Sequence, residues 1–342
     1  MVQYEHIILL QGTNVGLLRF LSDTGQGQYA QTPLQVSWHG AGAYQWLWPE
    51  LGEAMIVSIS LCRVTGLLVA VILLCTMPSG AYAWGEKGHR IVGHMARILL
   101  SPATQRAIRQ LMGSDDLTTF ALYLDLHKDQ LDLKIPGSRE WHYDDVPMCT
   151  TKPYAEYCPN GTCASTQLPR HYRRLVDVHE TRNRKQFAIL VLTHLMGDIH
   201  QPLHAADNDD NGGSQIKVRL PDGRKMNLHA VWDTSLVERR FGGQNEITVA
   251  RRLVQKYATR ATEWQAGKID LAKLQTWMSE ANQLAKTVAY GKLPGFACGT
   301  DMEQTRITLS EDYLRQAGAV VEEQLAKAGY RLASALNRAF GD

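Results

Sequence analysis

The sequence has little net charge, no internal repeat and few cysteines. Over 342 residues the formal net charge is only +2, from 36 basic and 34 acidic side chains. This balance excludes a protein-wide positive field, so any phosphate-bearing substrate has to be recognised locally. No repeat, low-complexity tract or linker divides the chain, which leaves no sign of a repeat array. With 44% hydrophobic residues, the composition is globular, and the length allows one large domain or two smaller ones.

A long apolar run is also missing, which argues against a membrane span. Residues 64–77 are the most apolar stretch and number fourteen, whereas crossing a bilayer takes roughly 20. Arg63 precedes this stretch, and the small-x-small sequence Ala81-Tyr82-Ala83 follows it. This layout predicts a signal peptide over residues 55–83 that is cleaved after Ala83, so that the protein is secreted or periplasmic.

The segment before the signal peptide shows no sustained helical or strand periodicity. A signal peptide belongs at the N-terminus, yet 54 residues precede Met55. We therefore expect Met55 to be the true start and residues 1–54 to be a non-native, disordered upstream extension; the alternative is a genuine pro-region or extra module. Residues 84–342 remain, and they are enough for one large single domain.

Four cysteines lie outside the signal segment: Cys149, Cys158, Cys163 and Cys298. An even number in an exported chain predicts two disulfide bonds. A structural zinc site is the alternative, but the spacing of these residues fits no usual thiolate zinc motif.

Helical patterns dominate residues 84–342. Residues 185–200 are apolar nearly all round, which indicates a central, buried helix. Residues 310–340 form a long amphipathic pattern with Ser310 as the expected N-cap. Residues 245–264 and 271–291 look like a pair of helices. The predicted fold class is therefore all-α.

One segment follows a strand pattern instead. Residues 215–228 alternate apolar and charged side chains on either side of Pro221-Asp222-Gly223, which predicts a β-hairpin. The expected architecture is a single, mainly helical domain with one small hairpin.

Histidine and aspartate recur with helical spacing in the central segment. His194 and Asp198 are four residues apart, so both project from one face of the helix. Pro202 then interrupts the helix and redirects His204. His200 points to the far side of the helix and is expected to be a structural or surface residue.

The same spacing returns beyond the hairpin, at His229 and Asp233. A single His-x-x-x-Asp pair is usually a surface pair. The pair on the apolar central helix cannot be exposed, however, and a buried carboxylate such as Asp198 needs a cation nearby. Two such pairs flanking a hairpin favour a hydrolytic zinc site.

Two further segments carry candidate ligands. Residues 84–96, "WGEKGHRIVGHMA", place His89 five residues after Trp84, and the segment ending in "WHYDDVPMC" carries Asp125 and His142. In this order, the motifs from Trp84 to the last His-x-x-x-Asp pair resemble the zinc-dependent single-strand-specific nucleases of the S1/P1 type. The resemblance covers residues 84–342, and "WHYDDVP" leans towards the bacterial branch.

The resemblance implies an all-α fold of the phospholipase C/nuclease type that holds three zinc ions in a cleft. It implies three ligand groups: Asp125, His142, His194 and Asp198; the amino group and carbonyl of Trp84 with His89 and Asp198; and His204, His229 and Asp233. A backbone amine can be a ligand only at a free terminus, so signal cleavage would complete the site.

The implied activity is hydrolysis of single-stranded DNA and RNA to 5′-phosphate products by a metal-bridged hydroxide, together with 3′-nucleotidase activity. The resemblance assigns catalytic roles to Asp125 and Lys128, although the family usually has Arg at the latter position. It places Tyr143 as the aromatic that stacks on a base and Asp145 as the carboxylate at the base edge. Ser214 stands where the family has Asn.

By analogy with the family, the cysteine pairs are Cys149–Cys298 and Cys158–Cys163. The family also implies 3′-nucleotides as substrates and a monomer without a stable protein partner. The alternative function is a trizinc phospholipase C that acts on phospholipid head groups. Such an enzyme typically has Glu in its last ligand pair and lacks the His-aromatic-x-Asp site, so Asp233 and "HYDD" favour the nuclease.

Overall fold

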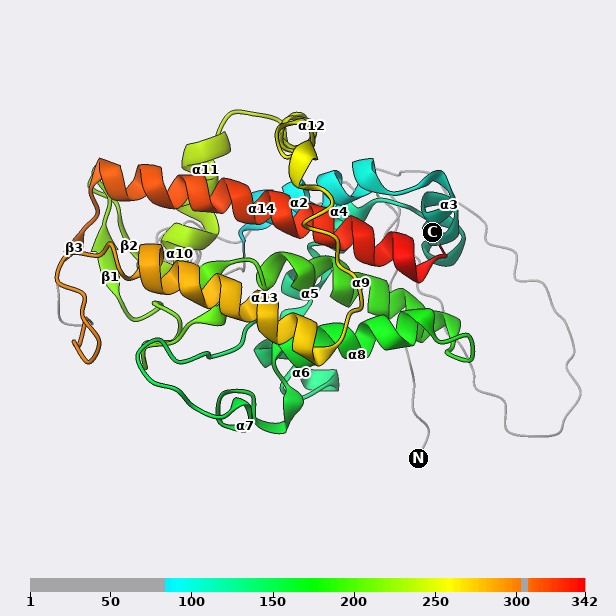
Figure 1. Ribbon diagram of the computed structural model, residues 1–342, viewed down its shortest axis with the longest axis horizontal. Coiled ribbons are helices and arrows are strands. Elements are labelled where there is room, and N and C mark those ends of the chain that lie inside the picture. Colours follow the sequence, from blue (N-terminus) through cyan, green and yellow to red (C-terminus); the bar gives the residue numbers. More distant parts are fainter. Residues whose placement is uncertain (1–83, 303–306, 342) are drawn as a thin grey trace, which may run out of the picture. The chain divides into compact units, whose positions relative to one another are not determined.

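The computed structural model describes residues 84–302 and 307–341 (Figure 1). The predicted upstream extension, 1–54, and signal peptide, 55–83, lie outside the described residues. The longer helices are α2 (Glu86–Leu99), α3 (Pro102–Met112), α8 (Ala164–Val176), α9 (Arg182–Asp198), α12 (Glu246–Lys256), α13 (Leu271–Leu284) and α14 (Glu311–Ala339).

Shorter helical segments connect them. The α-helical ones are α4 (Leu117–Phe120), α5 (Tyr123–Leu126), α6 (Lys128–Lys134), α7 (Tyr154–Tyr157), α10 (Leu228–Ala230) and α11 (Leu236–Phe241). The 3₁₀ and π segments are η2 (Ser138–His142), η3 (Pro159–Gly161), η4 (Pro202–Ala205), η5 (Val231–Ser235), η6 (Ala258–Arg260) and η7 (Ala285–Ala289). Among the described residues, no helix combines the length and apolarity needed to cross a membrane.

Helix α9 is the centre of the fold, as the sequence predicts. It begins at the Thr181 cap, whose side chain accepts a hydrogen bond from the Arg184 amide, and it is buried without a break from Val191 to Asp198. Helices α8, α14, α2, α4 and α5 pack around it. An apolar helix has to be covered on all sides, and this cover also encloses the two polar side chains, His194 and Asp198.

The C-terminal helix α14 runs along α2. The Ser310 hydroxyl accepts a hydrogen bond from the Tyr313 amide at 3.1 Å, so Ser310 is the N-cap, as predicted. Gly329 lets the two helices approach closely, since a Cβ there would lie 2.6 Å from the Cβ of Met95. This close contact packs the middle of α2, the helix that carries His89, against α14.

The predicted pair of helices is present, but the two helices pack on different neighbours. Helix α12 packs on α2 and α14, whereas α13 packs on α8, η4 and η7. The predicted hairpin is also present, as β1 (Lys217–Arg219) and β2 (Lys225–Asn227). A third strand, β3 (Ile307–Thr308), pairs in parallel with β1 and gives the strand order β2-β1-β3. Two residues are too few to show a strand period, so no pattern in the sequence predicts β3.

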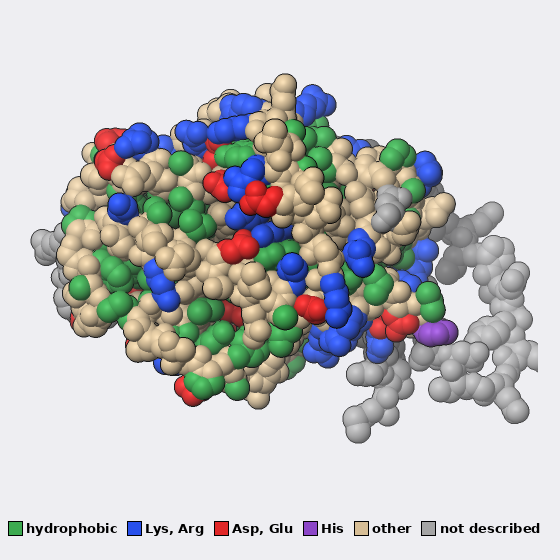
Figure 2. All heavy atoms as spheres, viewed as in Figure 1, with side chains coloured by type: hydrophobic (Ala, Val, Ile, Leu, Met, Phe, Trp, Pro, Cys, Tyr) green, Lys and Arg blue, Asp and Glu red, His purple; other side chains and the backbone are tan. Residues whose placement is uncertain are grey.

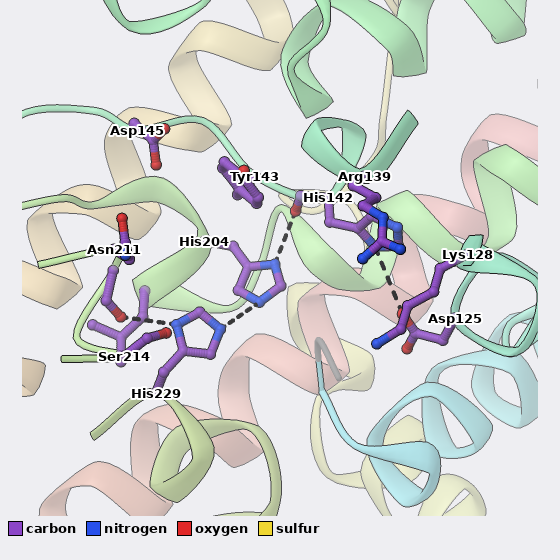
Figure 3. A pocket seen from close by; sticks show the side chains of 12 residues that line it. Asp125, Lys128, Arg139, His142, Tyr143, Asp145, His204, Asn211, Ser214 and His229 are labelled. Carbon is purple, nitrogen blue, oxygen red and sulfur yellow. Dashed lines mark hydrogen bonds and ion pairs between the residues drawn. The ribbon is translucent and has the colours of Figure 1, made fainter. Parts of the chain in front are cut away.

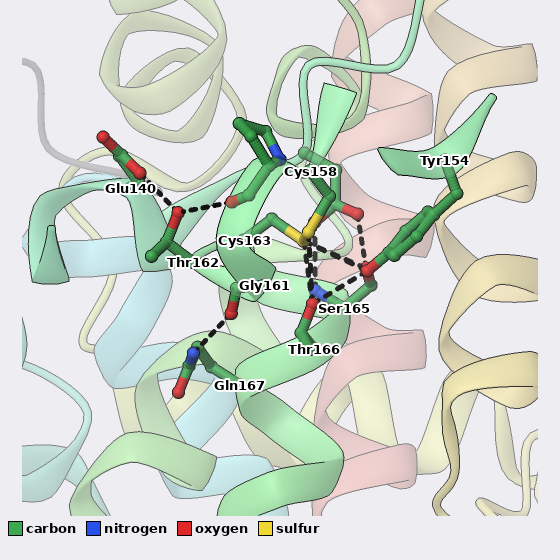
Figure 4. The surroundings of a disulfide bond; sticks show 11 residues. Glu140, Tyr154, Cys158, Gly161, Thr162, Cys163, Ser165, Thr166 and Gln167 are labelled. Carbon is green, nitrogen blue, oxygen red and sulfur yellow. Dashed lines mark hydrogen bonds between the residues drawn. A yellow bond between two sulfur atoms is a disulfide. The ribbon is translucent and has the colours of Figure 1, made fainter. Parts of the chain in front are cut away.

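Two disulfide bonds are present, Cys149–Cys298 and Cys158–Cys163. The second closes the short loop ahead of α8, where the Tyr154 hydroxyl hydrogen-bonds Ser165 at 2.7 Å (Figure 4). Basic and acidic side chains are interspersed on the face shown in Figure 2, in keeping with the small net charge.

Candidate metal centre and substrate pocket

Helices α2 and α9 bring three predicted residues together in the core. The Nε2 atom of His89 lies 3.2 Å from Oδ1 of Asp198, and the rings of His89 and His194 stack with centroids 4.1 Å apart. All three side chains are fully buried. The four-residue spacing on α9 places Nε2 of His194 3.2 Å from Oδ2 of Asp198.

Two residues from outside α9 complete this group. His142, at the end of η2, places Nδ1 3.0 Å from Oδ2 of Asp198 and 3.0 Å from Nε2 of His194. Asp125, on α5, places Oδ1 3.7 Å from Nε2 of His194 and 3.8 Å from Nδ1 of His142. Asp198 therefore lies between His89 on one side and the His142–His194 pair on the other, with one carboxylate oxygen directed to each.

A second group forms where η4, α10 and η5 meet. The Nε2 atoms of His204 and His229 are 3.1 Å apart. Asp233 places Oδ2 3.3 Å from Nε2 of His229 and Oδ1 3.7 Å from Nε2 of His204. The His229–Asp233 pair spans the junction of α10 with the π-helical segment η5, so the predicted spacing is kept on a distorted helix.

Backbone carbonyls orient three of the imidazoles. The Nδ1–H of His194 donates to the Ala121 carbonyl at 2.6 Å, and that of His229 donates to the Gly212 carbonyl at 2.8 Å. His204 does the same with the carbonyl of His142 at 2.8 Å. A proton fixed on Nδ1 leaves the Nε2 lone pair directed into the group, as in metal-ligating histidines.

The donors in both groups fit a cation. The Nε2 lone pairs of His204 and His229 face each other at hydrogen-bond distance with no proton to share. Among the described residues, Oδ1 of Asp198 and Oδ2 of Asp233 are buried without a hydrogen-bond partner, as are both ring nitrogens of His89. Orphaned buried polar atoms are rare in native proteins, and imidazole with carboxylate is the donor set of hydrolytic zinc sites.

The electrostatics point to the same conclusion. Burial and the neighbouring His229 lower the pKa of His204 to about 3, which keeps it a neutral ligand. Burial raises the pKa of Asp233 well above its usual value, and the carboxylates of Asp125 and Asp198 add to this effect. The pKa of His194 rises to about 9, since Asp198 and Asp125 outweigh the effect of burial. A metal ion would replace that proton.

Trp84, the first described residue, is anchored beside both groups. Its side chain is fully buried, and its indole N–H donates to the Gly197 carbonyl at 2.8 Å. The next amide, of Gly85, donates to the Asp233 carbonyl at 2.8 Å. The backbone of residue 84 is thus held between helix α9 and the segment that carries Asp233.

A cavity of about 290 Å³ opens onto these groups (Figure 3). Its lining includes seven residues that the sequence singles out for the site: Asp125, Lys128, His142, Tyr143, Asp145, His204 and His229. Lys128 lies on the Asp125 side, whereas Asp145 and Tyr143 lie on the His204 side (Figure 3). His89, His194, Asp198 and Asp233 lie behind this lining, fully or almost fully buried.

Several lining residues were missed by sequence reasoning. They are Arg139, Leu203, Asn211 and Gly212. Ser214, noted only as a departure from the family, also lines the cavity. The guanidinium group of Arg139 forms ion pairs with Asp129 at 2.6 Å and Asp132 at 3.2 Å. Arg139 is thus a second cationic residue in the cavity wall, beside Lys128 (Figure 3). Its position three residues before His142 was the only available signal.

Two buried residues behind the cavity were also missed. Gln201 donates from Nε2 to Oδ1 of Asp233 at 2.7 Å, and its Oε1 accepts from the Leu203 amide at 2.6 Å. Asp144 accepts from the Ser165 amide at 3.0 Å and from the Ser165 hydroxyl. Gln201 connects Asp233 to the η4 segment, and Asp144 connects the segment after His142 to the start of α8. Neither residue has a sequence spacing that would predict this role.

His200 takes no part in the site and is not on the surface. Its side chain is buried, with Nδ1 donating to the Met196 carbonyl and Nε2 2.9 Å from Nη1 of Arg331. Of the two roles expected from the sequence, the structural one applies.

Comparison with known proteins identifies the family. A family model described as S1/P1 Nuclease matches residues 84–341. The chain belongs to the S1/P1 nuclease family. It is therefore a hydrolase that acts on phosphodiester bonds, and the family does not favour the phospholipase alternative. Members of this family are metal-dependent, in keeping with the two groups of donors described above.

Three relatives illustrate the match. Endonuclease 2 of Arabidopsis thaliana is 27% identical over 299 residues, 82% of this chain and 98% of its own length. Nuclease S1 of Aspergillus oryzae is 27% identical over 273 residues, 75% of this chain and 91% of its own length. Nuclease P1 of Penicillium citrinum is 27% identical over 280 residues, 75% of this chain and 98% of its own length.

Proposed function

We propose that this S1/P1 nuclease is a zinc-dependent endonuclease that cleaves single-stranded DNA and RNA to 5′-phosphate products and also removes 3′-phosphates from nucleotides. The observation that carries the proposal is the shared Asp198 carboxylate, whose two oxygens face separate imidazole groups at 3.0–3.2 Å. A carboxylate in this position suits a pair of adjacent metal ions. The His204–His229–Asp233 group supplies a third site.

Three zinc ions are proposed per chain. The ligands are assigned as Asp125, His142, His194 and Asp198 for the first; the amino group and carbonyl of Trp84 with His89 and Asp198 for the second; and His204, His229 and Asp233 for the third. When bound, the ions would supply water activated for attack on phosphorus and positive charge against the phosphate oxygens.

The side chains of the cavity would position the substrate for that attack. Asp125, almost fully buried beside His142 and His194, would orient the attacking water by accepting a hydrogen bond. Lys128 would neutralise the charge that develops on the phosphate; as a compact ammonium group it lacks the bidentate geometry of Arg.

The other wall of the cavity would hold a base. Tyr143 presents a ring and Asp145 a carboxylate to the same space (Figure 3). Stacking on an aromatic ring contributes about 1–3 kcal/mol per base and tolerates any sequence. It requires a base that is free of its neighbours, which accounts for a preference for single strands.

Export is the remaining part of the proposal. Cleavage between Ala83 and Trp84 would free the amino group that the second ion needs, so the active site would be completed outside the cytoplasm, in a secreted or periplasmic monomer. Two disulfide bonds, Cys149–Cys298 and Cys158–Cys163, fit an oxidising compartment.

The proposal is tested by expressing the chain from Met55, sequencing the N-terminus of the exported protein and counting bound zinc. We expect Trp84 as the first residue, three zinc ions per chain, and hydrolysis of single-stranded DNA that a chelator abolishes. A different N-terminus or fewer than three tightly bound ions would contradict the Trp84–His89 assignment. Hydrolysis of single-stranded DNA that persists without metal would contradict the mechanism as a whole.

A further inference from the structure

The β-hairpin beside the cavity carries an unfavourable pairing of charges. In the antiparallel register Arg219 lies directly opposite Lys225, and Lys217 lies opposite Asn227. Like charges directly opposite each other on a sheet are destabilising. The intervening pair, Val218 and Met226, faces the other side, where Val218 is buried. The cations therefore share the outer face of the hairpin.

These cations are not neutralised by nearby acids. Lys217, Arg219 and Lys225 are all exposed, and within the described part of the chain none of them forms an ion pair. The only acid of the turn, Asp222, is engaged by Arg224 at 2.8 Å. The outer face thus presents three positive charges that no ion pair among the described residues compensates.

Residues that line the cavity lie directly before and after the hairpin in the sequence. Ser214, in the cavity wall, is three residues before Lys217, which places their Cα atoms within about 10 Å of each other. At the other end of the hairpin, the amides of Leu228 and His229 donate to the carbonyls of Ile216 and Gly213 at 2.9 and 3.4 Å. The base of the hairpin is therefore fixed to the loop that lines the cavity.

The cavity is small for a nucleic-acid chain. At about 290 Å³, it is at the lower limit of pockets that hold one small ligand. A nucleic-acid chain that enters it must continue across the surrounding surface, and its backbone carries one negative charge per nucleotide. An exposed group of unpaired cations adjoining the cavity has the charge that such a chain needs.

We propose that Lys217, Arg219 and Lys225 form a contact surface for the phosphate backbone of single-stranded nucleic acid beyond the nucleotide held in the cavity. This inference rests on the proposed function, since it extends the same substrate along the protein. Edge protection, in which charges on an outer strand prevent aggregation, would explain Lys225 on β2. It does not explain Lys217 and Arg219, because β1 is the middle strand of the sheet.

The test compares long and short substrates in the full-length exported enzyme. In K217Q/R219Q/K225Q we expect KM for a single-stranded DNA of about 30 nucleotides to rise about tenfold at moderate salt, as three exposed charge contacts are lost. The salt dependence, as the slope of log KM against log salt concentration, should fall by about 2. Kinetic constants for a dinucleotide should stay unchanged, which also shows that the variant is folded.

The matched control is R106Q/R173Q/R251Q. It removes three exposed cations, from α3, α8 and α12, that form no ion pair with any residue the structure describes. It makes the same change in net charge and should leave the KM of the long substrate unchanged. An equal loss in the control, or no loss in the hairpin variant, would overturn the inference. Failure of the wild-type enzyme to cleave either substrate would instead contradict the proposed function.

The single variant R219Q gives a second readout. Removing one member of the like-charge pair should stabilise the fold slightly while raising KM for the long substrate about twofold. If R219Q lowers the melting temperature or promotes aggregation and leaves KM unchanged, the cations serve the sheet and the inference fails.

Discussion

The imidazoles of His204 and His229 meet at their Nε2 atoms, 3.1 Å apart, while each donates its Nδ1–H to a backbone carbonyl. Two lone pairs at this distance repel each other unless a cation lies between them. The neighbouring Asp233 carboxylate is buried, and its Oδ2 has no hydrogen-bond partner in the described part of the chain. It adds the negative charge that such a cation needs. Without a metal ion, this arrangement of lone pairs and a buried carboxylate destabilises the folded state.

Metal removal is therefore expected to destabilise the protein as well as inactivate it. Ions that bind the folded state at 100 times their Kd contribute about 2.7 kcal/mol per site. Loss of one such site should lower the melting temperature by about 5–11 °C for a domain of this size. Calorimetry before and after chelation, and again after zinc is restored, measures the effect. An unchanged melting temperature would show that the groups are stable without a cation.

Asp198→Asn should remove two ions at once. Only one oxygen of an amide can act as a ligand, so the side chain cannot serve His89 on one side and His142–His194 on the other. We expect zinc content to fall from three towards one and kcat to fall at least about a thousandfold. Asp222→Asn, on the exposed hairpin turn, is the control and should retain the zinc content and kcat of the wild type. Full zinc content in Asp198→Asn would exclude the shared ligand.

Gln201→Met should weaken the third site without removing a ligand. The variant loses the hydrogen bond that orients Oδ1 of Asp233, and partners of this kind typically change metal affinity 10–100-fold. Titration with a competing chelator should show one ion released more readily, while the other two are held as before. Gln255→Met, on the exposed face of α12, is the control and should leave the release of all three ions unchanged.

Base binding should depend on pH through Asp145. Partial desolvation, reinforced by Asp207 and Asp144, raises the pKa of Asp145 to about 6. The carboxyl group is protonated below that pH and ionised above it. Acceptance of hydrogen bonds from a base should therefore strengthen as the pH rises through 6, and KM for a guanine dinucleotide should fall.

Asp145→Asn provides the comparison, because an amide does not titrate. The ratio of the KM of the variant to the KM of the wild type should rise as the pH increases through 6. Effects of pH on the metal ligands are common to both proteins and therefore cancel in this ratio. A ratio that does not vary with pH would assign the base edge to another residue.

The two disulfide bonds should contribute unequally to stability. The Cys149–Cys298 bond joins residues 149 apart in sequence, and Cys158–Cys163 joins residues 5 apart. Chain entropy predicts about 5 kcal/mol for the longer ring and about 2 kcal/mol for the shorter one. Denaturation of the Cys149→Ser/Cys298→Ser and Cys158→Ser/Cys163→Ser variants measures both. A larger loss from the shorter ring would mean that native-state contacts, such as those of Tyr154, outweigh chain entropy.

Local patterns in the sequence were sufficient to predict much of the fold. Continuous apolarity predicted the buried α9, the Ser310 cap predicted the start of α14, and alternation about Pro221–Gly223 predicted the hairpin. These features depend on neighbours within a few residues, where helix and strand periods relate sequence directly to position. The same periodicity placed His194 with Asp198, and His229 with Asp233, on common faces.

Contacts between distant segments depend on how the helices pack. Asp198 serves His89, 109 residues earlier in the numbering, and His142, 56 residues earlier, only because α2 and η2 pack against α9. Gln201 and β3 likewise acquire their roles from partners distant in the chain, Asp233 and β1.

Local sequence patterns specify a set of donors with the right chemistry and spacing, within helices that had to be buried. They do not determine which oxygen of Asp198 faces which imidazole, nor that Arg219 lies opposite Lys225 beside the cavity. Those relationships follow from strand register and helix packing, where many weak apolar contacts act together. No local period encodes them, so the arrangement of the site is a property of the folded core.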